Sequence, residues 1–465
     1  MNDLLCRYIL NLNKIVDEFF KHSNIKQAMT KFLKKKCWLV FFAFYFNLFQ
    51  GLQGQVYHHI TDAGAWCWFS DPRAIYLHGK ETSVLTGWVK EDGSIEAARI
   101  NLKTKEIQKQ ILFNQLEKDD HDNPAFLELA DNGYIAFYAK HGRGDLYYHR
   151  NSEKEDQLFG EVSIFDPIGK EELEKFPRRQ VTYANPVQLS NENNRIYCFG
   201  RWTGYKPNMM WSEDNGKTFT KSKVFIAEEG FRNANRPYVK YYSDGKSRIH
   251  FIFTDGHPRD EPVNSVYYAY YEQGAFWRAD GTKICNLQDI PFKPKDATVV
   301  YQATMETGRA WVHDIVADKK GHPTILYTRY PTEQEHIYSY AQFDGKQWHN
   351  HFICNSGSWF PQTKPGEEEK EPNYSAGLIL HPLHLNTVYL SRKINGIFEI
   401  EKWVTKNHGQ DWTSTTITAN SKYDNVRPFI PRNMRRKDKT MLLWMVNEKY
   451  IHYTDYKTSI NFIIE

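Results

Sequence analysis

Residues 121–141 read HDNPAFLELADNGYIAFYAKH, with a histidine at each end and two apolar runs between them. Asp131-Asn132-Gly133 in the middle is typical of a tight turn, and the flanking FLELA and YIAFYA are typical of strands. The stretch therefore predicts a β-hairpin. Because a hairpin returns the chain to its starting edge, we expect His121 and His141 to lie on the same rim of a sheet.

The same design recurs along the chain in seven copies. Each copy has a polar or proline-containing entry, a β-run, a turn rich in Gly, Asn or Asp, and a second β-run. The copies start at residues 71, 121, 183, 236, 313, 374 and 427. This period predicts an all-β fold, a single-domain seven-bladed β-propeller of four-stranded antiparallel blades. Six or eight blades stay open, because pairing of the last strands with residues 57–62 would also close a ring.

A second recurring piece lies between the hairpins. WSEDNGKTF (211–219) matches the Asp-box pattern Ser-x-Asp-x-Gly-x-Thr-Phe, and TKNHGQDW (405–412) is a looser copy. Such boxes are tight turns between the outer strands of a propeller blade, held by Asp and Ser side chains. We therefore assign their aspartate a structural role.

The charge of the chain separates a basic leader from a near-neutral body. Residues 1–54 hold 8 Lys and Arg and 3 Asp and Glu, which leaves 52 Lys and Arg against 53 Asp and Glu elsewhere. A body of this kind gives no indication of a nucleic-acid partner.

Within the leader, a basic run that starts at Met29 precedes the apolar stretch CWLVFFAFYFNLF (37–49) and small residues up to Gly54. This order predicts a secretory signal peptide starting at Met29, with a catalytic domain over 55–465. The apolar stretch is short for a membrane span, so we expect none after cleavage, with an uncleaved anchor as the alternative. The protein is then secreted or periplasmic, exported by a Gram-negative bacterium, and we expect a monomer.

In a propeller the innermost strand of each blade runs along the channel and the second strand returns beside it. Hairpin entries and exits should therefore meet at one mouth of the channel. The residues expected there are Asp71, Arg73, His121, His141, Tyr183, Arg201, Arg236, His257, His313, Arg329, Tyr374, Arg392, Asn425 and Arg427. A mouth rich in Arg, His and Tyr attracts an anion and offers flat surfaces for sugar rings. Each residue alone could be a structural contact, but the bias of the set indicates a binding site.

These residue types favour elimination over hydrolysis. A hydrolytic glycosidase usually needs two carboxylates, whereas the mouth offers Asp71 and a few aspartates that flank turns. β-Elimination at a uronic acid requires neutralisation of the C6 carboxylate, removal of the C5 proton and protonation of O4. Arginine suits the first task and His or Tyr the other two, without a metal or organic cofactor.

Four cysteines follow the leader, at 67, 198, 285 and 354, too few and too scattered to predict a disulfide framework. The group with metal-ligand chemistry is Cys285, His349, His351 and Cys354. Its spacing matches no recognised zinc pattern. A structural metal ion and ordinary buried thiols beside surface histidines therefore both stay open.

Five stretches carry a resemblance to a known family: GAWCWFSDPRA (64–74), DDHDNPAF (119–126), RPYVKYY (236–242), FTDGHPRD (253–260) and NYSAGLIL…VYLSR (373–392). They resemble the BNR/Asp-box proteins that include the propeller ulvan lyases, over nearly the whole chain after residue 60. The resemblance implies a polysaccharide lyase, a carbon–oxygen lyase, whose partner is an acidic sulfated polysaccharide. It would cut the linkage from rhamnose 3-sulfate to a uronate and leave an unsaturated uronate end.

The resemblance also implies roles for individual residues. Arg201 would neutralise the uronate carboxylate, while His121 and Tyr183 would share the base and acid roles. Tyr205 and Tyr238 are possible substitutes for Tyr183. The residues expected to bind substrate are His141, His257, Arg73, Arg236, Arg329, Arg392 and Tyr374.

Two other functions stay open. Related propellers include a rhamnosidase that acts on rhamnose–glucuronate linkages from a different face, for which His58 or His59 would be the residues of interest. An α-L-rhamnosidase-type glycoside hydrolase is therefore one alternative, and a non-catalytic carbohydrate-binding propeller is the other.

Overall fold

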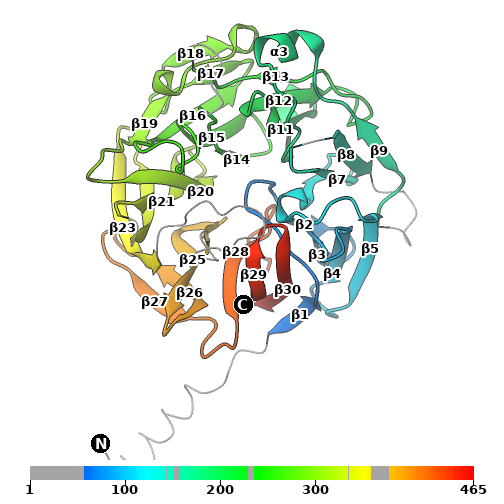
Figure 1. Cartoon of the computed structure of the whole chain (residues 1–465), viewed down its shortest axis with the longest axis vertical. Helices are drawn as coiled ribbons and strands as arrows, with labels where there is room; N and C mark the ends of the chain where they lie inside the picture. The colour runs from blue at the N-terminus through cyan, green and yellow to red at the C-terminus, as the bar shows by residue number, and fades with distance from the viewer. Residues whose placement is uncertain (1–56, 143, 151–157, 229–234, 333–334, 358–375) are drawn as a thin grey trace, which may run out of the picture. The chain divides into compact units, whose positions relative to one another are not determined.

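Seven antiparallel sheets follow one another around a ring in the computed structural model (Figure 1). The structure describes residues 57–142, 144–150, 158–228, 235–332, 335–357 and 376–465, and the count of sheets refers to these. Residues 57–465 form one compact unit. The prediction of an all-β, seven-bladed propeller is confirmed, whereas the predicted leader lies outside the described residues.

Blades 1 to 3 each have four strands. Blade 1 consists of β2 (Ala74–His78), β3 (Thr82–Val89), β4 (Ile95–Asn101) and β5 (Ile107–Phe113). Blade 2 consists of β6 (Ala125–Glu128), β7 (Tyr134–Ala139), β8 (Leu146–Arg150) and β9 (Val162–Phe165). Blade 3 consists of β10 (Asn185–Leu189), β11 (Arg195–Thr203), β12 (Lys206–Ser212) and β13 (Lys223–Val224).

Blade 4 departs from the predicted four strands. It consists of β14 (Val239–Ser243), β15 (Arg248–Thr254), β16 (Val266–Glu272), β17 (Ala275–Trp277), β18 (Lys283–Asn286) and β19 (Thr298–Tyr301). The edge of β16 is long enough to pair with both β17 and β19, which accounts for the additional strands.

Blades 5 to 7 return to four strands. Blade 5 consists of β20 (Arg309–Ala317), β21 (Pro323–Tyr330), β22 (His336–Phe343) and β23 (Trp348–Gly357). Blade 6 consists of β24 (Leu378–His381), β25 (His384–Ile394), β26 (Ile397–Val404) and β27 (Thr413–Thr416). Blade 7 consists of β28 (Asp424–Phe429), β29 (Met441–His452), β30 (Asp455–Ile464) and β1 (His58–Thr61).

The ring is closed by the two ends of the compact unit. β1 is the outermost strand of blade 7 and pairs antiparallel with β30, with His58 opposite Phe462 and His59 opposite Asn461. The pairing of residues 57–62 with the last strands is thus part of blade 7 rather than an eighth blade. Each blade of such a ring keeps only a short outer edge, and in blade 7 that edge is β1.

Replacing Ile60 by alanine is expected to lower the free energy of unfolding by about 2–5 kcal/mol. The Ile60 side chain is buried in the core between blades 1 and 7, so its loss leaves a cavity where the ring closes. Denaturant unfolding measures the change, with His59→Ala on the exposed side of β1 as the matched control. Equal stabilities of the two variants would contradict a closing role for β1.

Burial explains why the inner strands read as apolar runs. All six residues of β7 (YIAFYA) are buried, whereas no residue of the outer strand β9 (VSIF) is buried. Inner strands are covered on both faces by neighbouring blades, so they cannot show the alternation of a half-exposed strand. The core therefore lies between blades rather than along one face of a sheet.

The segment between β1 and β2 fills the middle of the ring. The Trp68 indole stacks on His313 of blade 5 at 5.6 Å between ring centroids. Lys240 of blade 4 donates to the Trp68 carbonyl, and Asn185 of blade 3 donates to the Phe69 carbonyl at 3.0 Å. The channel is thus occupied by the chain's own side chains, and a site must lie at one of its mouths.

The WSEDNGKTF segment forms a tight turn between β12 and β13. Asp214 accepts hydrogen bonds from the backbone N–H groups of Lys217 and Thr218 and from the Thr218 hydroxyl. Ser212 accepts from the N–H of Gly216, whose φ of +80° few other residues adopt. The side chain of Asp214 is therefore used within its own turn.

Helix is scarce in the described part of the chain. The α-helix there is α3 (Lys170–Lys175), and the 3₁₀ turns are η1 (Asp120–Asp122), η2 (Ser190–Glu192), η3 (Leu287–Asp289) and η4 (Pro294–Asp296). None of the described helices has the length and apolar character needed to cross a membrane.

Candidate active site

The predicted hairpin is blade 2's inner pair of strands, and it brings its two histidines together. Ala125 of β6 lies opposite Phe137 of β7, so η1 before β6 and the residues after β7 share one end of the blade. His121 sits in η1 and His141 follows β7. Their rings are stacked, with centroids 4.0 Å apart and an interplanar angle of 18°.

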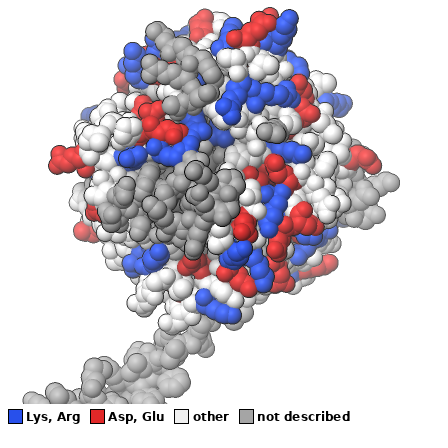
Figure 2. Space-filling model, in the orientation of Figure 1, with Lys and Arg blue, Asp and Glu red and all other residues white. Residues whose placement is uncertain are grey.

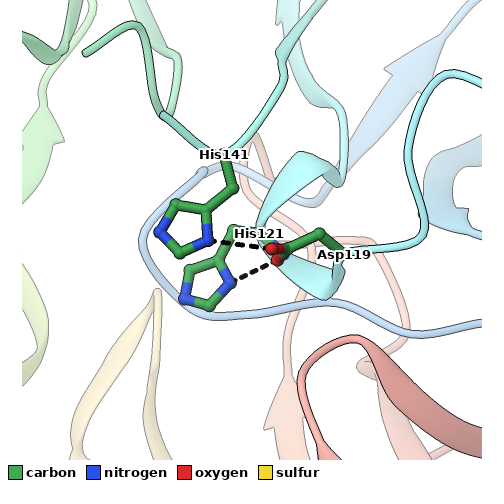
Figure 3. A group of neighbouring side chains, drawn as sticks. All are labelled: Asp119, His121 and His141. Carbon is green, nitrogen blue, oxygen red and sulfur yellow. Dashed lines mark hydrogen bonds and ion pairs between the residues drawn. The ribbon is translucent and has the colours of Figure 1, made fainter. Parts of the chain in front are cut away.

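One carboxylate holds both imidazoles (Figure 3). Asp119 Oδ1 lies 2.6 Å from His121 Nδ1, and its Oδ2 lies 2.8 Å from His141 Nδ1. Asp119 also accepts the backbone N–H of His121 at 3.0 Å, as the N-cap of η1. The carboxylate thereby favours a proton on Nδ1 of each ring. Both Nε2 atoms are left to accept a proton, and neither has a hydrogen-bond partner among the described residues.

The electrostatics of the triad keep Asp119 ionised. Burial alone would raise the pKa of its carboxyl, but the imidazoles of His141 and His121 outweigh burial and hold that pKa well below its usual value. Burial and the ring of His121 lower the pKa of His141, while the contact with Asp119 opposes the fall. The neutral, proton-accepting form of His141 is therefore favoured at neutral pH.

Replacing Asp119 by asparagine is expected to lower the pKa of His141 further, because the carboxylate charge is one of the two contributions that raise it. Titration of the imidazole Cε1–H signals by NMR measures the shift. Asp344→Asn, which removes an exposed carboxylate paired with His349, is the matched control and should leave His141 unchanged. An unchanged His141 in Asp119→Asn would contradict the bridging contact.

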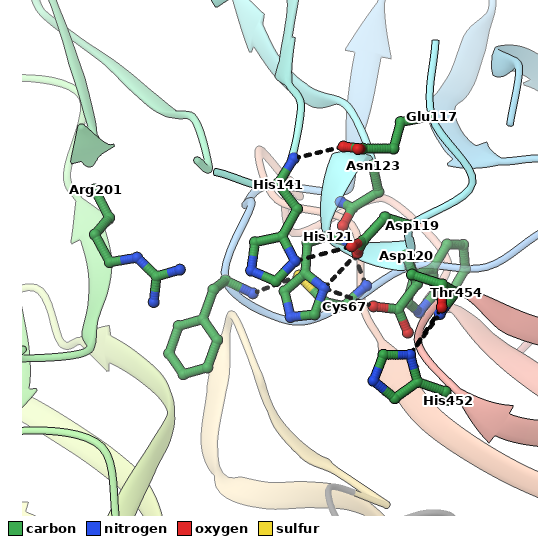
Figure 4. A network of polar contacts seen from close by, with 12 residues as sticks. Cys67, Glu117, Asp119, Asp120, His121, Asn123, His141, Arg201, His452 and Thr454 are labelled. Carbon is green, nitrogen blue, oxygen red and sulfur yellow. Dashed lines mark hydrogen bonds and ion pairs between the residues drawn. The ribbon is translucent and has the colours of Figure 1, made fainter. Parts of the chain in front are cut away.

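Blade 3 presents a buried arginine toward this pair. Arg201 in β11 is 5% exposed, and in Figure 4 its guanidinium points toward His121 and His141. Its Nη1 donates to the Tyr238 hydroxyl at 2.5 Å, and its Nε has no hydrogen-bond partner in the part of the chain that the structure describes. No carboxylate of the described residues forms an ion pair with it. A buried cation without an anion is costly unless a ligand supplies the charge.

Tyrosine rings surround that guanidinium. Its Cζ lies 5.1 Å from the ring centroid of Tyr183, 5.2 Å from Tyr238 and 5.7 Å from Tyr205. The Tyr183 ring is also 5.9 Å from that of His121, so it lies between the arginine and the histidine pair. Tyr183 has a left-handed φ of +65°, a strained conformation that clusters at functional sites.

Blade 7 supports η1 from the other side (Figure 4). Asp120 accepts from Arg427 at 2.6 Å and from the Tyr450 hydroxyl at 2.5 Å, and its N–H donates to the Tyr453 carbonyl at 3.0 Å. The Tyr453 ring meets His121 edge-on at 4.8 Å. Burial raises the pKa of Tyr453 to about 12, so its hydroxyl stays protonated at neutral pH.

Blade 4 completes the rim of the site. The His257 ring lies 5.2 Å from Tyr238, and its pKa is well below the usual value because of burial and the nearby Arg236 and Arg259. Arg236 pairs with Asp260 at 2.5 Å and lies 5.4 Å from the Tyr205 ring. His257 is therefore a neutral polar group beside the arginine.

The structure brings together His121, His141, Tyr183, Arg201 and His257, with Arg236 at the edge. It does not bring the other predicted arginines to them. Arg73 is buried in the channel and paired with Asp71 at 2.9 Å. Arg329 donates to Ser339, and Arg392 pairs with Glu401 at 2.6 Å on blade 6.

The predicted substrate-binding residue Tyr374 is not placed by the structure, and the histidines considered for a rhamnosidase site lie away from the candidate active site. Tyr374 lies outside the described residues. His58 and His59 lie in β1, on the outside of blade 7, and His59 contacts Asn461 and Asp62 there. They are remote from the channel mouths because β1 is an outermost strand.

The four residues weighed as a metal site are not brought together. Cys285 lies in β18 of blade 4, whereas His349, His351 and Cys354 lie in β23 of blade 5. His349 is paired with Asp344 at 2.8 Å. In the described part of the chain, the side chains close enough to share an ion are instead Asp119, His121 and His141, whose ligand atoms all lie within 4.8 Å of one another.

Charge on the visible face of the molecule is mixed rather than of one sign (Figure 2). Lys and Arg are interspersed with Asp and Glu over the face shown in Figure 2. This fits the near-neutral body of the sequence. Attraction of an anion would therefore depend on individual buried cations such as Arg201.

Comparisons with known proteins add a family and a fold. Residues 84–356 match the model described as BNR repeat-containing family member. No curated protein sequence matches the chain. A solved structure of a polysaccharide lyase, PL25-Ulvanlyase, bound to -[GlcA(1-4)Rha3S]-, is 13% identical with a TM-score of 0.65 and covers 87% of this chain and 95% of its own.

A second solved structure, polysaccharide lyase Uly1, is 13% identical with a TM-score of 0.54 and covers 89% of this chain and 93% of its own. At such identities these likenesses establish the shared propeller fold. The family match spans more than half of the sequence and includes both histidines, Tyr183 and Arg201. The chain belongs to the BNR repeat-containing family.

Proposed function

We propose that the protein is a secreted polysaccharide lyase that cleaves ulvan, an acidic sulfated polysaccharide, by β-elimination at a uronate. The observation that carries this proposal is the buried Arg201, which has no carboxylate partner among the described residues and faces two imidazoles with accepting Nε2 atoms. A uronate carboxylate supplies the missing anion, and its C5 proton then lies on the side of the histidines.

The chemistry needs three groups, and the site supplies them from the chain itself. Arg201 binds the C6 carboxylate and stabilises the negative charge that develops when the C5–H bond breaks. His121 and Tyr183 share the remaining roles: one takes the C5 proton, and the other gives a proton to O4 as the C4–O4 bond breaks. The electron pair of the C5–H bond becomes the C4=C5 double bond of the product.

The carboxylates of the site argue against hydrolysis. A hydrolase needs two carboxyl groups free to act as acid and base or nucleophile. Here Asp119 is bonded to two imidazoles, Asp120 to Arg427 and Tyr450, and Glu117 to the N–H of His141 at 3.0 Å. Each of these three is bonded to a protein donor. Asp122 is fully buried, its oxygens have no hydrogen-bond partner among the described residues, and burial and the neighbouring carboxylates raise its pKa. A hydrolase needs two free carboxyl groups, so the elimination scheme fits better.

Ulvan is the proposed substrate because the site matches a uronate and a solved structure of the same fold holds -[GlcA(1-4)Rha3S]-. The basic leader and apolar stretch of residues 29–49 support export of the enzyme.

Incubation with ulvan tests the proposal. β-Elimination produces a conjugated unsaturated uronate, which raises the ultraviolet absorbance with each cut. New reducing ends without a rise in absorbance would instead indicate a hydrolase. Binding without either product would indicate a carbohydrate-binding propeller.

A further inference from the structure

The face of the propeller opposite the histidines carries a large groove. It is built from the turns that join the first and second strands of blades 4, 5 and 6, with the β28–β29 loop of blade 7 beside them. Its volume is about 1080 Å³. The residues that matter for its chemistry are Tyr242, Lys246, Lys319, Lys320, Leu383 and Arg436.

The acidic side chains of the groove are already engaged. Asp244 accepts the backbone N–H groups of residues 246, 247 and 248, and Asp318 accepts those of residues 320 and 322. Glu272 pairs with Arg248 at 2.9 Å. These carboxylates hold turns together, and among the described residues none of them forms an ion pair with a lysine of the groove.

The basic side chains have no such partners. Lys246, Lys319, Lys320 and Arg436 are exposed, and within the described residues no ion pair or side-chain hydrogen bond involves any of them. They come from three different blades, so the fold and not one local sequence run assembles them. Four unpaired cations around one groove form a site for an anionic ligand.

We propose that this groove is an accessory binding site for a second stretch of an acidic, sulfated polysaccharide chain. The ligand class rests on the proposed lyase function, because both sites would hold parts of one polymer. The Tyr242 ring and the exposed Leu383 offer apolar surface for sugar rings between the cations. The site holds long chains near the enzyme but takes no part in bond cleavage.

The spacing of charge in the groove favours a polysaccharide over a nucleic acid. Double-stranded DNA carries one negative charge per about 1.7 Å and is bound by continuous basic surfaces. Here Asp244, Asp318 and Glu272 interrupt the cations. A polymer with a sulfate or carboxylate on each sugar or every second sugar can place its charges at the lysines and its apolar ring faces between them.

Electrophoresis of the full protein through native gels containing ulvan tests the proposal. The double variant Lys319→Ser, Lys320→Ser is expected to have a dissociation constant for ulvan, measured from the retardation, that is about ten times higher. Charge attraction dominates the binding of a polyanion, so the loss of two positive charges weakens it. Lys217→Ser with Lys346→Ser removes the same charge from exposed turns outside the groove and should bind like the wild type. A parallel gel with desulfated ulvan separates recognition of sulfate from recognition of carboxylate.

The possible results distinguish binding in the groove from binding at the candidate active site, and they test the groove separately from the proposed lyase function. Retardation that survives in His121→Ala but falls in the double lysine variant supports a separate site. Unchanged binding of the Lys319→Ser, Lys320→Ser variant overturns the proposal. The wild type could form no unsaturated product while its retardation still depends on the two lysines. This result would contradict the proposed lyase function and support the proposed binding groove.

Discussion

Replacing Arg201 by alanine is expected to lower kcat/KM on ulvan by a factor of about 10³, the size of effect that removal of one preorganised donor to a developing oxyanion produces. The guanidinium is buried and lacks an anionic partner among the described residues, so its charge is available to the substrate carboxylate. Initial rates of the rise in ultraviolet absorbance measure the loss.

Two companion variants make this result specific. Arg201→Lys keeps the charge but loses the planar fork that binds a carboxylate with two hydrogen bonds, so an intermediate rate is expected. Arg99→Ala removes an arginine of β4 whose one side-chain hydrogen bond within the described residues goes to Ser83, and it should keep full activity. Full activity of Arg201→Ala, with a thermal midpoint like that of the wild type, would contradict the assignment of Arg201.

The fold could be predicted because its signals are local and repeated. The turn at Asp131–Gly133 and the two apolar runs beside it required no knowledge of the rest of the chain, and β6 and β7 lie where they predict. Pairing of residues 57–62 with the last strands stayed an open alternative in the sequence, tied to a different number of blades, and it proves to be part of blade 7. The extra strands of blade 4 could not be foreseen, because which strand edge they pair with is decided by distant packing.

The site was only partly predictable from the sequence. The predicted end of a strand gives the position of the backbone, but it does not give the direction in which the side chain points. Successive side chains on a strand point to opposite faces, so a residue at the right end of a strand can still point away from the mouth. Arg329 turns toward Ser339 and Arg392 toward Glu401 for this reason. Arg73 is held within the channel by Asp71.

Sequence reasoning also missed the groups that hold the histidines. Asp119 lies two residues before His121, and that spacing suits an N-cap but does not reveal that the same carboxylate reaches His141. Tyr453, whose ring contacts that of His121, is more than 300 residues from it along the chain. Arg427 was expected at the same mouth, but its bond to Asp120 was not. Only closure of the ring places blade 7 beside η1, so no local pattern indicates these contacts.

The second large effect is expected for His121→Ala, which should lower kcat/KM by about 10²–10⁴ if His121 moves a proton in the reaction. Asp119 occupies Nδ1 of both imidazoles, so Nε2 is the one atom left on each ring for proton transfer. His349→Ala removes an exposed histidine that is likewise bonded to an aspartate and is the matched control.

The pH dependence of the same variants assigns the roles of His121 and Tyr183. A histidine base is active when neutral, so kcat/KM rises as pH increases through its pKa, and His121→Ala removes this limb while Tyr183→Phe keeps it. The reverse pattern assigns the base to Tyr183, whose ring lies 5.9 Å from His121 and 5.1 Å from the Arg201 guanidinium carbon. Added imidazole should partly restore His121→Ala, because it can take the place of the lost ring as a proton acceptor. If His121→Ala and Arg201→Ala both keep full activity, the reaction takes place elsewhere on the propeller.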